Sequence, residues 1–319
     1  MRPRRFSVSV DLSLKFDVGS RPWSPWQAAK RLAILIAVTA VAAFFAVPMI
    51  WLVLQSSQPG GLGLVQPWTF GSFNQIVLNW DVIFSQFWAG GDTQRWLLNS
   101  VFYSGSGAAI AVACCVPAGY ALATHDFRGR KVLLTITMLV MLIPTNALVL
   151  PLFLEANSVH LLSSPLAVIL PYGLFPFGVY LAYLYFNTAR FEALFQTARM
   201  DGCDEWHVFR RIAVPLAMPV AALIVFLDFV ASWTNFFLPW VMYWSLDMTS
   251  RYPVALGIAL QLSTGETFGS PVPGALQLQT TSPASQIALL VLVTSAPVLV
   301  VFVLAQRWIG SGRVQGIFD

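Results

Sequence analysis

Charged residues are scarce in this chain. They make up 10% of its 319 residues, whereas hydrophobic residues make up 57%. A soluble globular domain usually carries about 25% charged residues, so an ordinary water-soluble fold is excluded. The mean hydropathy of +0.70 points the same way. The composition therefore indicates a protein embedded in a membrane.

Motifs that bind metals or nucleotides are also missing. The chain has three cysteines and three histidines, with no Cys-x-x-Cys pair and no histidine cluster, so we expect no metal site. It contains no Gly-x-x-x-x-Gly-Lys-[Ser/Thr] loop, the motif that surrounds ATP phosphates. We therefore expect no catalytic residues and no cofactor bound by this chain.

Six apolar runs are each long enough to cross about 30 Å of hydrocarbon as a helix. They cover roughly residues 32–54, 97–123, 132–154, 162–186, 212–243 and 284–306. None shows the short alternating pattern of an outer-membrane barrel strand. We predict an all-α, polytopic membrane protein of about six transmembrane helices, in which the first run is a retained span rather than a signal peptide.

The distribution of Lys and Arg predicts the orientation of these helices. Of the 18 basic residues, 16 fall in the N-terminal tail, the C-terminus and the two loops that share their side of the membrane. Loops on the cytoplasmic side carry the excess of Lys and Arg, so both termini are expected to be cytoplasmic, with the chain in the bacterial inner membrane. The asymmetry also accounts for the net charge of +4, and we expect the lipid bilayer and no nucleic acid as a partner.

A tail at residues 1–31 is predicted to precede the membrane domain at 32–319. Within the tail, apolar and polar residues alternate strictly over residues 6–18, which is the period of a strand with one buried face. Two interpretations stay open: a short strand that docks on a neighbouring subunit, or a disordered tail in which the alternation is accidental.

A charged segment interrupts the apolar sequence between the fourth and fifth predicted spans, at residues 187–211. Apolar residues recur there at three- and four-residue spacing, which predicts helix; they are Phe191, Leu194, Phe195, Ala198, Trp206 and Phe209. Gly202 interrupts the pattern, so we expect two short helices that meet at a corner. A side chain at Gly202 would add bulk there, and strain if its φ is positive. The apolar face is expected to meet a cytoplasmic partner or, alternatively, to lie on headgroups or on the protein's own helix ends.

This segment resembles the coupling loop in the permease subunits of binding-protein-dependent ABC importers. The family's loop carries Glu-Ala-Ala, three residues, Gly, nine residues, Ile, one residue and Leu-Pro. Here Gln196-Thr197-Ala198, Gly202, Ile212, Val214 and Pro215 stand at that spacing. The resemblance implies that the loop contacts a cytoplasmic ATPase, with a site at Leu194, Gln196, Thr197, Ala198, Asp201, Gly202, Phe209, Ile212 and Pro215. The family's glutamate helps to anchor the loop, whereas Gln196 can hydrogen-bond but cannot form an ion pair.

Further stretches resemble the maltose-type, carbohydrate-uptake branch of that family. They are "WLLNSVFYS", "AGYALATHDFRGRKVL", "LIPTNALVLPLF", "WTNFFLP" and "QRWIGSGRVQGIFD". Thr234 stands where the branch has asparagine, and Asp319 where it has lysine. The resemblance covers roughly residues 45–319. It implies a permease that takes up a sugar or related polar solute. The implied partners are a second homologous permease, an ATP-binding cassette ATPase dimer that holds ATP and Mg²⁺, and an extracytoplasmic solute-binding protein. Loops 55–95 and 245–282 would meet that binding protein, or would be merely flexible connectors.

Candidates for the transport path lie in the fourth and fifth runs. Asp228 falls inside an apolar run, where an ionisable group is costly and suggests function; the alternative is an acid that only packs between helices. Trp233, Thr234 and Asn235 follow, and Asp228 and Asn235 are expected on one helix face about 10 Å apart. An aromatic ring beside carboxylate and amide groups suits a sugar, although Trp233 could be plain packing. Tyr172 and Tyr180 are further candidates.

Other classes remain as alternatives. A secondary transporter would show two related halves with broken helices in matching positions, and the sequence shows no such repeat. A membrane-embedded enzyme would need clustered catalytic groups, whereas His125, His160 and His207 lie in different loops. An ABC importer permease for a non-sugar solute, such as a glycerophosphodiester, also stays open.

Overall fold

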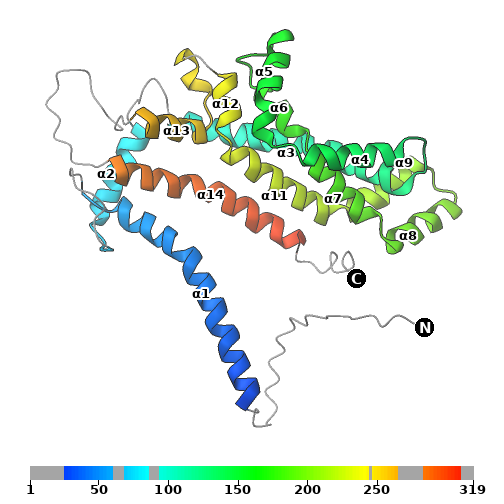
Figure 1. Ribbon diagram of the computed structural model, residues 1–319, viewed down its shortest axis with the longest axis horizontal. Coiled ribbons are helices and arrows are strands. Elements are labelled where there is room, and N and C mark those ends of the chain that lie inside the picture. Colours follow the sequence, from blue (N-terminus) through cyan, green and yellow to red (C-terminus); the bar gives the residue numbers. More distant parts are fainter. Residues whose placement is uncertain (1–24, 60–67, 86–92, 244–245, 265–282, 310–319) are drawn as a thin grey trace. The chain divides into compact units, whose positions relative to one another are not determined.

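The computed structural model describes residues 25–59, 68–85, 93–243, 246–264 and 283–309. These residues form helices and no strand, as predicted (Figure 1). The helices are α1 (Pro25–Ser56), α2 (Phe73–Ser85), α3 (Thr93–Thr124), α4 (Arg130–Met141), η1 (Thr145–Leu148), α5 (Val149–Ser158), α6 (Leu166–Gly173), α7 (Pro176–Phe186), α8 (Ala189–Met200), α9 (Glu205–His207), η2 (Val208–Ala213), α10 (Val214–Leu216), α11 (Met218–Thr234), α12 (Phe237–Met242), η3 (Leu246–Arg251), α13 (Val254–Thr264) and α14 (Pro283–Ile309).

The chain divides into two units, residues 1–50 and 51–319. The first contains most of α1, which begins at Pro25, earlier than the predicted boundary between tail and membrane domain. The alternating segment at residues 6–18 lies outside the described residues. The second unit contains both candidate sites.

Membrane-spanning segments number four to six in the part of the chain that the structure describes. Four helices are long and apolar enough by themselves: 29–56, 93–124, 166–186 and 284–309. Two further spans are bent pairs. The first joins α4 to η1 and α5 with a bend of 100°, and the second joins α9–α10 to α11 with a bend of 65°. With each pair taken as one span, the predicted number of about six is reached.

The two bends correct the expectation of continuous helices at 132–154 and 212–243. Pro144 lies in the first break, and Pro215 and Pro219 flank the second. Proline lacks a backbone N–H and clashes with the preceding turn, so a helix breaks or kinks there. The fifth run is interrupted again after Thr234, where Asn235 adopts extended backbone angles of φ −81° and ψ 118°.

Helix α3 is the centre of the second unit and packs against α6, α7 and α11 (Figure 1). Its small residues permit close approach. A Cβ atom on Gly119 would lie 2.4 Å from the Cβ of Ala182 on α7, and one on Gly107 would lie 2.9 Å from the Cβ of Tyr172 on α6. Small residues at helix contacts are a common device in membrane bundles. A larger side chain at either glycine would push α3 away from its neighbour.

Loops 55–95 and 245–282 contain structure that the sequence did not predict. Helix α2 lies in the first loop, and η3 and α13 lie in the second. Side chains at the start of α3 hold the second loop: Asn99 Nδ2 donates to the carbonyls of Ser250 and Tyr252, and the Tyr103 hydroxyl donates to the carbonyl of Arg251. These parts of the two loops are therefore more than flexible connectors.

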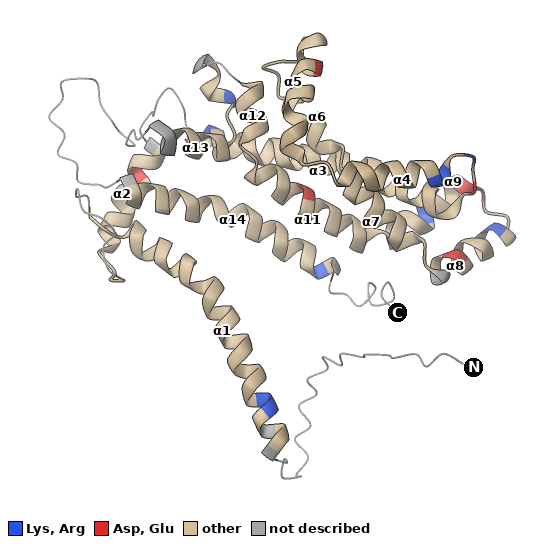
Figure 2. Ribbon diagram, in the orientation of Figure 1, with Lys and Arg blue, Asp and Glu red and all other residues tan. Residues whose placement is uncertain are grey.

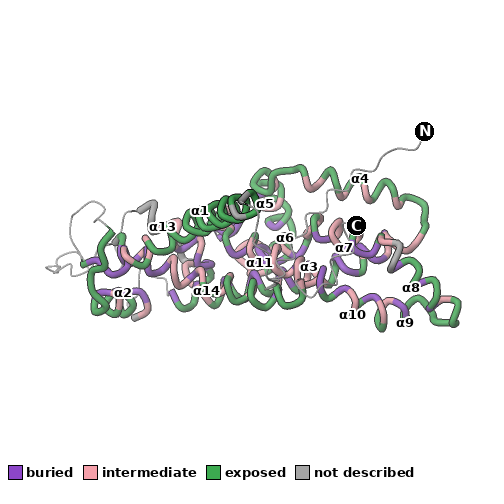
Figure 3. Tube along the Cα trace, turned by 90° about the horizontal axis from the view of Figure 1, so that it is seen from below, coloured by how far each residue is buried: buried purple, intermediate pink, exposed green. Residues whose placement is uncertain are grey.

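Helix α4 is a long, mostly exposed helix of the second unit. None of its residues is buried, and Figure 3 shows it as a mixture of exposed and partly buried residues. Its apolar side chains include Val132, Leu133, Ile136, Met138 and Leu139. An exposed apolar helix of this kind suits contact with lipid or with another membrane subunit. Figure 2 shows Lys and Arg where α4 begins, and both basic and acidic residues where α8 and α9 meet.

Candidate coupling corner and transport path

Helices α8 and α9 meet at a corner centred on Gly202, as the sequence predicted. We call residues 189–213 the corner segment. Gly202 has φ +83°, and the backbone N–H groups of Gly202 and Cys203 close the end of α8 by donating to the carbonyls of Arg199 and Ala198, both at 3.1 Å. A Cβ atom at Gly202 would meet nothing within 4 Å. The expectation that a side chain here would crowd the two helices is therefore wrong. Only the backbone strain from the positive φ remains.

The apolar stripe of the corner segment packs mainly inward. Phe195 is 1% exposed, and Phe191 and Ala198 are buried as well. The Phe195 ring lies 5.4 Å from the Tyr120 ring at the end of α3 and 6.2 Å from the Phe186 ring on α7, measured between centroids. This packing matches the alternative in which the stripe covers the protein's own helix ends.

A smaller apolar set points outward from the same segment. Leu194, Met200 and Trp206 are 41%, 88% and 61% exposed. These three side chains, together with the exposed Thr197 and Asp201, are the outer face of the corner. Ala198 and Phe209, which the family resemblance had placed in the coupling site, instead support the corner from within.

Glu205 is the hydrogen-bonding hub of the corner. Its carboxylate accepts hydrogen bonds from Arg199 Nε at 2.6 Å and from the Tyr120 hydroxyl at 3.3 Å, and His125 Nε2 lies 3.3 Å away. The bond to Glu205 raises the pKa of the Arg199 guanidinium, which therefore stays charged. One carboxylate thus connects α8, α9 and the end of α3.

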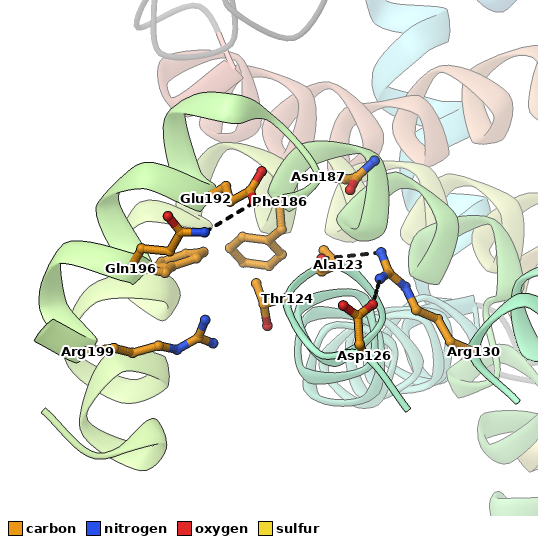
Figure 4. A pocket seen from close by; sticks show the side chains of 10 residues that line it. Ala123, Thr124, Asp126, Arg130, Phe186, Asn187, Glu192, Gln196 and Arg199 are labelled. Carbon is orange, nitrogen blue, oxygen red and sulfur yellow. Dashed lines mark hydrogen bonds and ion pairs between the residues drawn. The ribbon is translucent and has the colours of Figure 1, made fainter. Parts of the chain in front are cut away.

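Gln196 is used within its own helix. It is exposed, and its Nε2 donates to Glu192 Oε1 at 3.2 Å, one turn earlier (Figure 4). The remaining predicted residues lie where the corner joins the fifth span. Ile212 is partly buried in the π-helical turn η2, and Pro215 is exposed in α10. A π-helical turn inside a helix is frequent at functional sites.

A polar pocket of about 390 Å³ lies behind α8. Figure 4 shows its side chains: Arg130 bonds to Asp126 at 2.5 Å, and Glu192 bonds to Gln196. Each of these charged groups already has a partner within the pocket wall, so neither is a vacant binding group.

Asp228 and Tyr172 lie together in the bundle, near Gly107 of α3. Asp228 is 3% exposed, and a Cβ atom at Gly107 would lie 3.7 Å from its Oδ2. Neither Asp228 Oδ2 nor the Tyr172 hydroxyl has a hydrogen-bond partner among the described residues. Buried polar groups are normally paired. Asp228 of α11 and Tyr172 of α6 therefore both lie beside Gly107, where α3, α6 and α11 meet.

Trp233 and Tyr180 are held by packing. Trp233 is 5% exposed, stacks on Phe229 with centroids 5.4 Å apart, and donates its Nε1–H to the Thr294 carbonyl at 3.2 Å. Tyr180 stacks on Tyr183 with centroids 6.2 Å apart. For Trp233 this arrangement agrees with the packing alternative that the sequence left open.

Thr234 and Asn235 line an open, mostly apolar pocket of about 650 Å³ where the third and fifth spans break. We call it the helix-break cavity; its lining residues are Asn146, Ala147, Ala231, Thr234, Asn235, Phe236 and Phe237. Asp228 does not line it, so the expected face shared by Asp228 and Asn235 is not formed around this cavity. The sequence reasoning missed Asn146, for which the available signal was its position two residues after Pro144.

No group of three His, Cys, Asp or Glu that could hold a metal ion occurs within the described ranges. The two regions are an exposed corner in which one carboxylate connects three helices, and an uncharged cavity beside two helix breaks.

Residues 115–314 match the family described as "Binding-protein-dependent transport system inner membrane component". The chain is 26% identical over 300 residues to the arabinooligosaccharides transport system permease protein AraQ of Bacillus subtilis (strain 168). This match covers 92% of this chain and 97% of AraQ. It is 25% identical to the diacetylchitobiose uptake system permease protein NgcG of Streptomyces coelicolor, over 85% of this chain and 83% of NgcG. It is 30% identical to the B. subtilis protein LplC, over 68% and 71% of the two chains.

Among solved structures, the fold is similar to a chain in the crystal structure of a bacterial ABC transporter involved in the import of the acidic polysaccharide alginate. The TM-score is 0.73 at 20% identity, and the match covers 90% of this chain and 99% of that one.

Proposed function

The chain belongs to the family of binding-protein-dependent transport system inner membrane components and is a permease subunit of a sugar ABC importer. We propose that its corner segment is the lever on which the partner ATPase acts. The family is one of inner-membrane transport subunits rather than enzymes. Energy for moving the helices must therefore come from ATP and Mg²⁺ bound to the ATPase dimer.

The observation that supports the lever is the two-sided character of the corner. Its outer face exposes Leu194, Met200 and Trp206, while its inner face buries Phe195 against Tyr120. Exposed apolar side chains in such a group suit a protein–protein contact. Since interiors are close-packed and transmit displacement, a push on the outer face moves α3, α7 and the fifth span together.

Other surfaces of the chain suit the two remaining partners, the second permease and the solute-binding protein. The exposed apolar side of α4 suits a second, homologous permease, and the helices in loops 55–95 and 245–282 suit the solute-binding protein on the opposite side of the membrane. In this arrangement both termini are cytoplasmic. The relatives named for arabinooligosaccharides and diacetylchitobiose favour an oligosaccharide as the solute.

Gly202→Asp tests the lever, with Gly129→Asp as a matched control. Both glycines have positive φ, +83° and +96°, and a Cβ atom would meet nothing within 4 Å at either position. The backbone strain is therefore similar at the two positions, and modest because aspartate is among the residues that adopt the left-handed region, but only Gly202 lies at the corner. We expect Gly202→Asp to weaken pull-down of the ATPase and to abolish stimulation of ATP hydrolysis by loaded binding protein in proteoliposomes.

Two outcomes would count against the lever. One is unchanged ATPase association and unchanged stimulated hydrolysis with Gly202→Asp. The other is an equal loss with Gly129→Asp, which would mean that strain anywhere in these loops disturbs the complex. Gly202→Asn serves as a mild variant, because asparagine tolerates positive φ as aspartate does but adds no charge at the corner, and it should retain most of the coupling.

A further inference from the structure

We propose that α2 lies in the membrane–water interface, with one stripe of its side chains among the lipids of the leaflet at which α1 ends. The stripe consists of Phe73, Val77, Trp80 and Phe84. In the orientation proposed above this is the outer leaflet. The inference goes beyond the permease function, because it concerns how the loop between the first two spans is held at the membrane and requires neither the ATPase nor a solute.

Hydrogen bonds fix α2 to the end of the first span. Asn79 Nδ2 donates to the carbonyl of Ser56, the last residue of α1, at 2.9 Å. The Ser72 N–H, directly before α2, donates to the Ser57 carbonyl at 2.9 Å. Helix α2 also packs against α3 and against α14, at whose start Figure 1 shows it. Because α1 and α14 are both long enough to cross a bilayer, α2 is held where spans leave the hydrocarbon.

The apolar stripe is formed by residues three and four positions apart, which share one side of a helix. Phe73, Val77 and Trp80 are 71%, 49% and 50% exposed. Phe84 is partly buried, and its ring centroid lies 4.4 Å from that of Trp80. The stripe therefore runs the length of α2 and is open to the surroundings over most of that length.

The polar side chains of α2 lie on its other faces. Gln75 and Asn79 are only 7% and 0% exposed, so this helix buries polar groups and presents aromatic ones outward, the reverse of a helix surrounded by water. Asn74 and Asp81 are exposed, and at 3.6 residues per turn they lie about 80° round the helix from the apolar stripe. A helix that lies flat in the interface has this arrangement, with an apolar face in the lipid and a polar face toward water.

The composition of the stripe favours lipid over a protein partner. Trp and Tyr are enriched where membrane proteins cross the boundary between lipid and water, and Trp68 and Phe70, just before α2, are also 61% and 54% exposed. The four side chains of the stripe include no charged group. An interface that forms and dissociates, as one with a soluble binding protein must, is only about as apolar as the rest of a protein surface. The face with Asn74 and Asp81 stays available to the binding protein.

The experiment places a nitroxide on α2 in the complete importer, reconstituted in proteoliposomes. Val77→Cys carries the label in the apolar stripe, and Asn74→Cys is the matched control at another exposed position of the same helix. Both are made with Cys114→Ser and Cys203→Ser, which remove the exposed cysteines. Collision rates with oxygen and with a water-soluble nickel chelate are then measured by electron paramagnetic resonance.

We expect the ratio of oxygen to nickel collisions to be about fivefold or more higher at position 77 than at position 74, because a polar chelate is excluded from hydrocarbon. Phe73→Cys repeats the measurement one turn earlier, so that the result does not depend on one variant. Equal ratios at 77 and 74, with nickel reaching both, would place the stripe in water and refute the proposal. Weak collisions with both reagents at 77 would show a protein cover instead: the second permease if they are weak from the start, or the binding protein if they become weak only when it is added.

Discussion

The hydroxyl of Tyr120, near the end of α3, donates a hydrogen bond to Glu205 of the corner segment at 3.3 Å, across 85 positions of sequence. The ring of Tyr120 is buried among Phe186, Phe195 and Phe209, with centroid distances of 5.1–5.5 Å. The same tyrosine therefore contacts the corner through both its hydroxyl and its ring. It connects the second span to the corner segment, which the chain itself joins directly only to the fourth and fifth spans.

Tyr120→Phe is expected to weaken coupling without disturbing the fold, because it removes the hydroxyl and keeps the ring. A hydrogen bond to a charged group is worth about 1.5–3 kcal/mol when shielded, and the Glu205 side chain is 48% exposed, which lowers that figure. We expect roughly a three- to tenfold loss of solute-stimulated ATP hydrolysis in proteoliposomes. Tyr183→Phe, at a partly buried tyrosine that stacks on Tyr180, is the control, and a similar loss there would contradict the role of the Tyr120 hydroxyl.

Gln196→Glu restores the carboxylate that the family carries, yet we expect it to give no gain in ATPase association. Gln196 Nε2 lies 3.2 Å from Glu192 Oε1, so the substitution places two carboxylates one turn apart, which destabilises a helix by about 0.2–0.5 kcal/mol. The double variant Glu192→Gln with Gln196→Glu should relieve this repulsion and bind the ATPase more tightly than the single variant. Pull-down of the ATPase measures both, and a gain in the single variant would refute the argument.

Cys203 is a native probe of the corner. It is exposed beside Gly202, whereas Cys115 is buried and Cys114 lies within a membrane span. We expect a membrane-impermeant maleimide to label Cys203 in inside-out vesicles and not in intact cells, and we expect added ATPase to protect it several-fold. Cys203→Ser gives the background signal. Labelling from outside would overturn the orientation, and labelling that the ATPase does not reduce would place the ATPase elsewhere.

Asp228→Asn separates a transport role from simple packing. The change keeps the size of a side chain that is 3% exposed and whose Oδ2 has no partner among the described residues. If the acid only packs between helices, replacing the carboxyl group with a carboxamide of the same size should leave uptake normal. We expect uptake to fall about tenfold or more while the complex still assembles. Ser232→Ala, at another buried polar residue of α11, is the control, and normal uptake in Asp228→Asn would remove Asp228 from the path.

The candidate sites differ in how much of them could be predicted. The corner at Gly202 was predictable, because helical spacing and one interrupting glycine are local features of the sequence. The side of the corner that faces inward was not, since Phe195 is buried by Tyr120 and Phe186 from other helices. Likewise, Thr234 and Asn235 could be selected from the sequence, but their shared cavity with Asn146 depends on two breaks that meet only in the folded chain.

The sequence by itself determined that this is a helical membrane protein with about six spans and a charged loop before the fifth. Apolar runs long enough to cross a bilayer and the distribution of Lys and Arg are properties of consecutive residues, and hydrocarbon acts on them directly. Only the tertiary structure decided which proline-containing runs bend, which side of the corner is buried, and which distant polar groups share a cavity. Those outcomes depend on how helices pack against one another, and packing joins residues that are far apart in the chain.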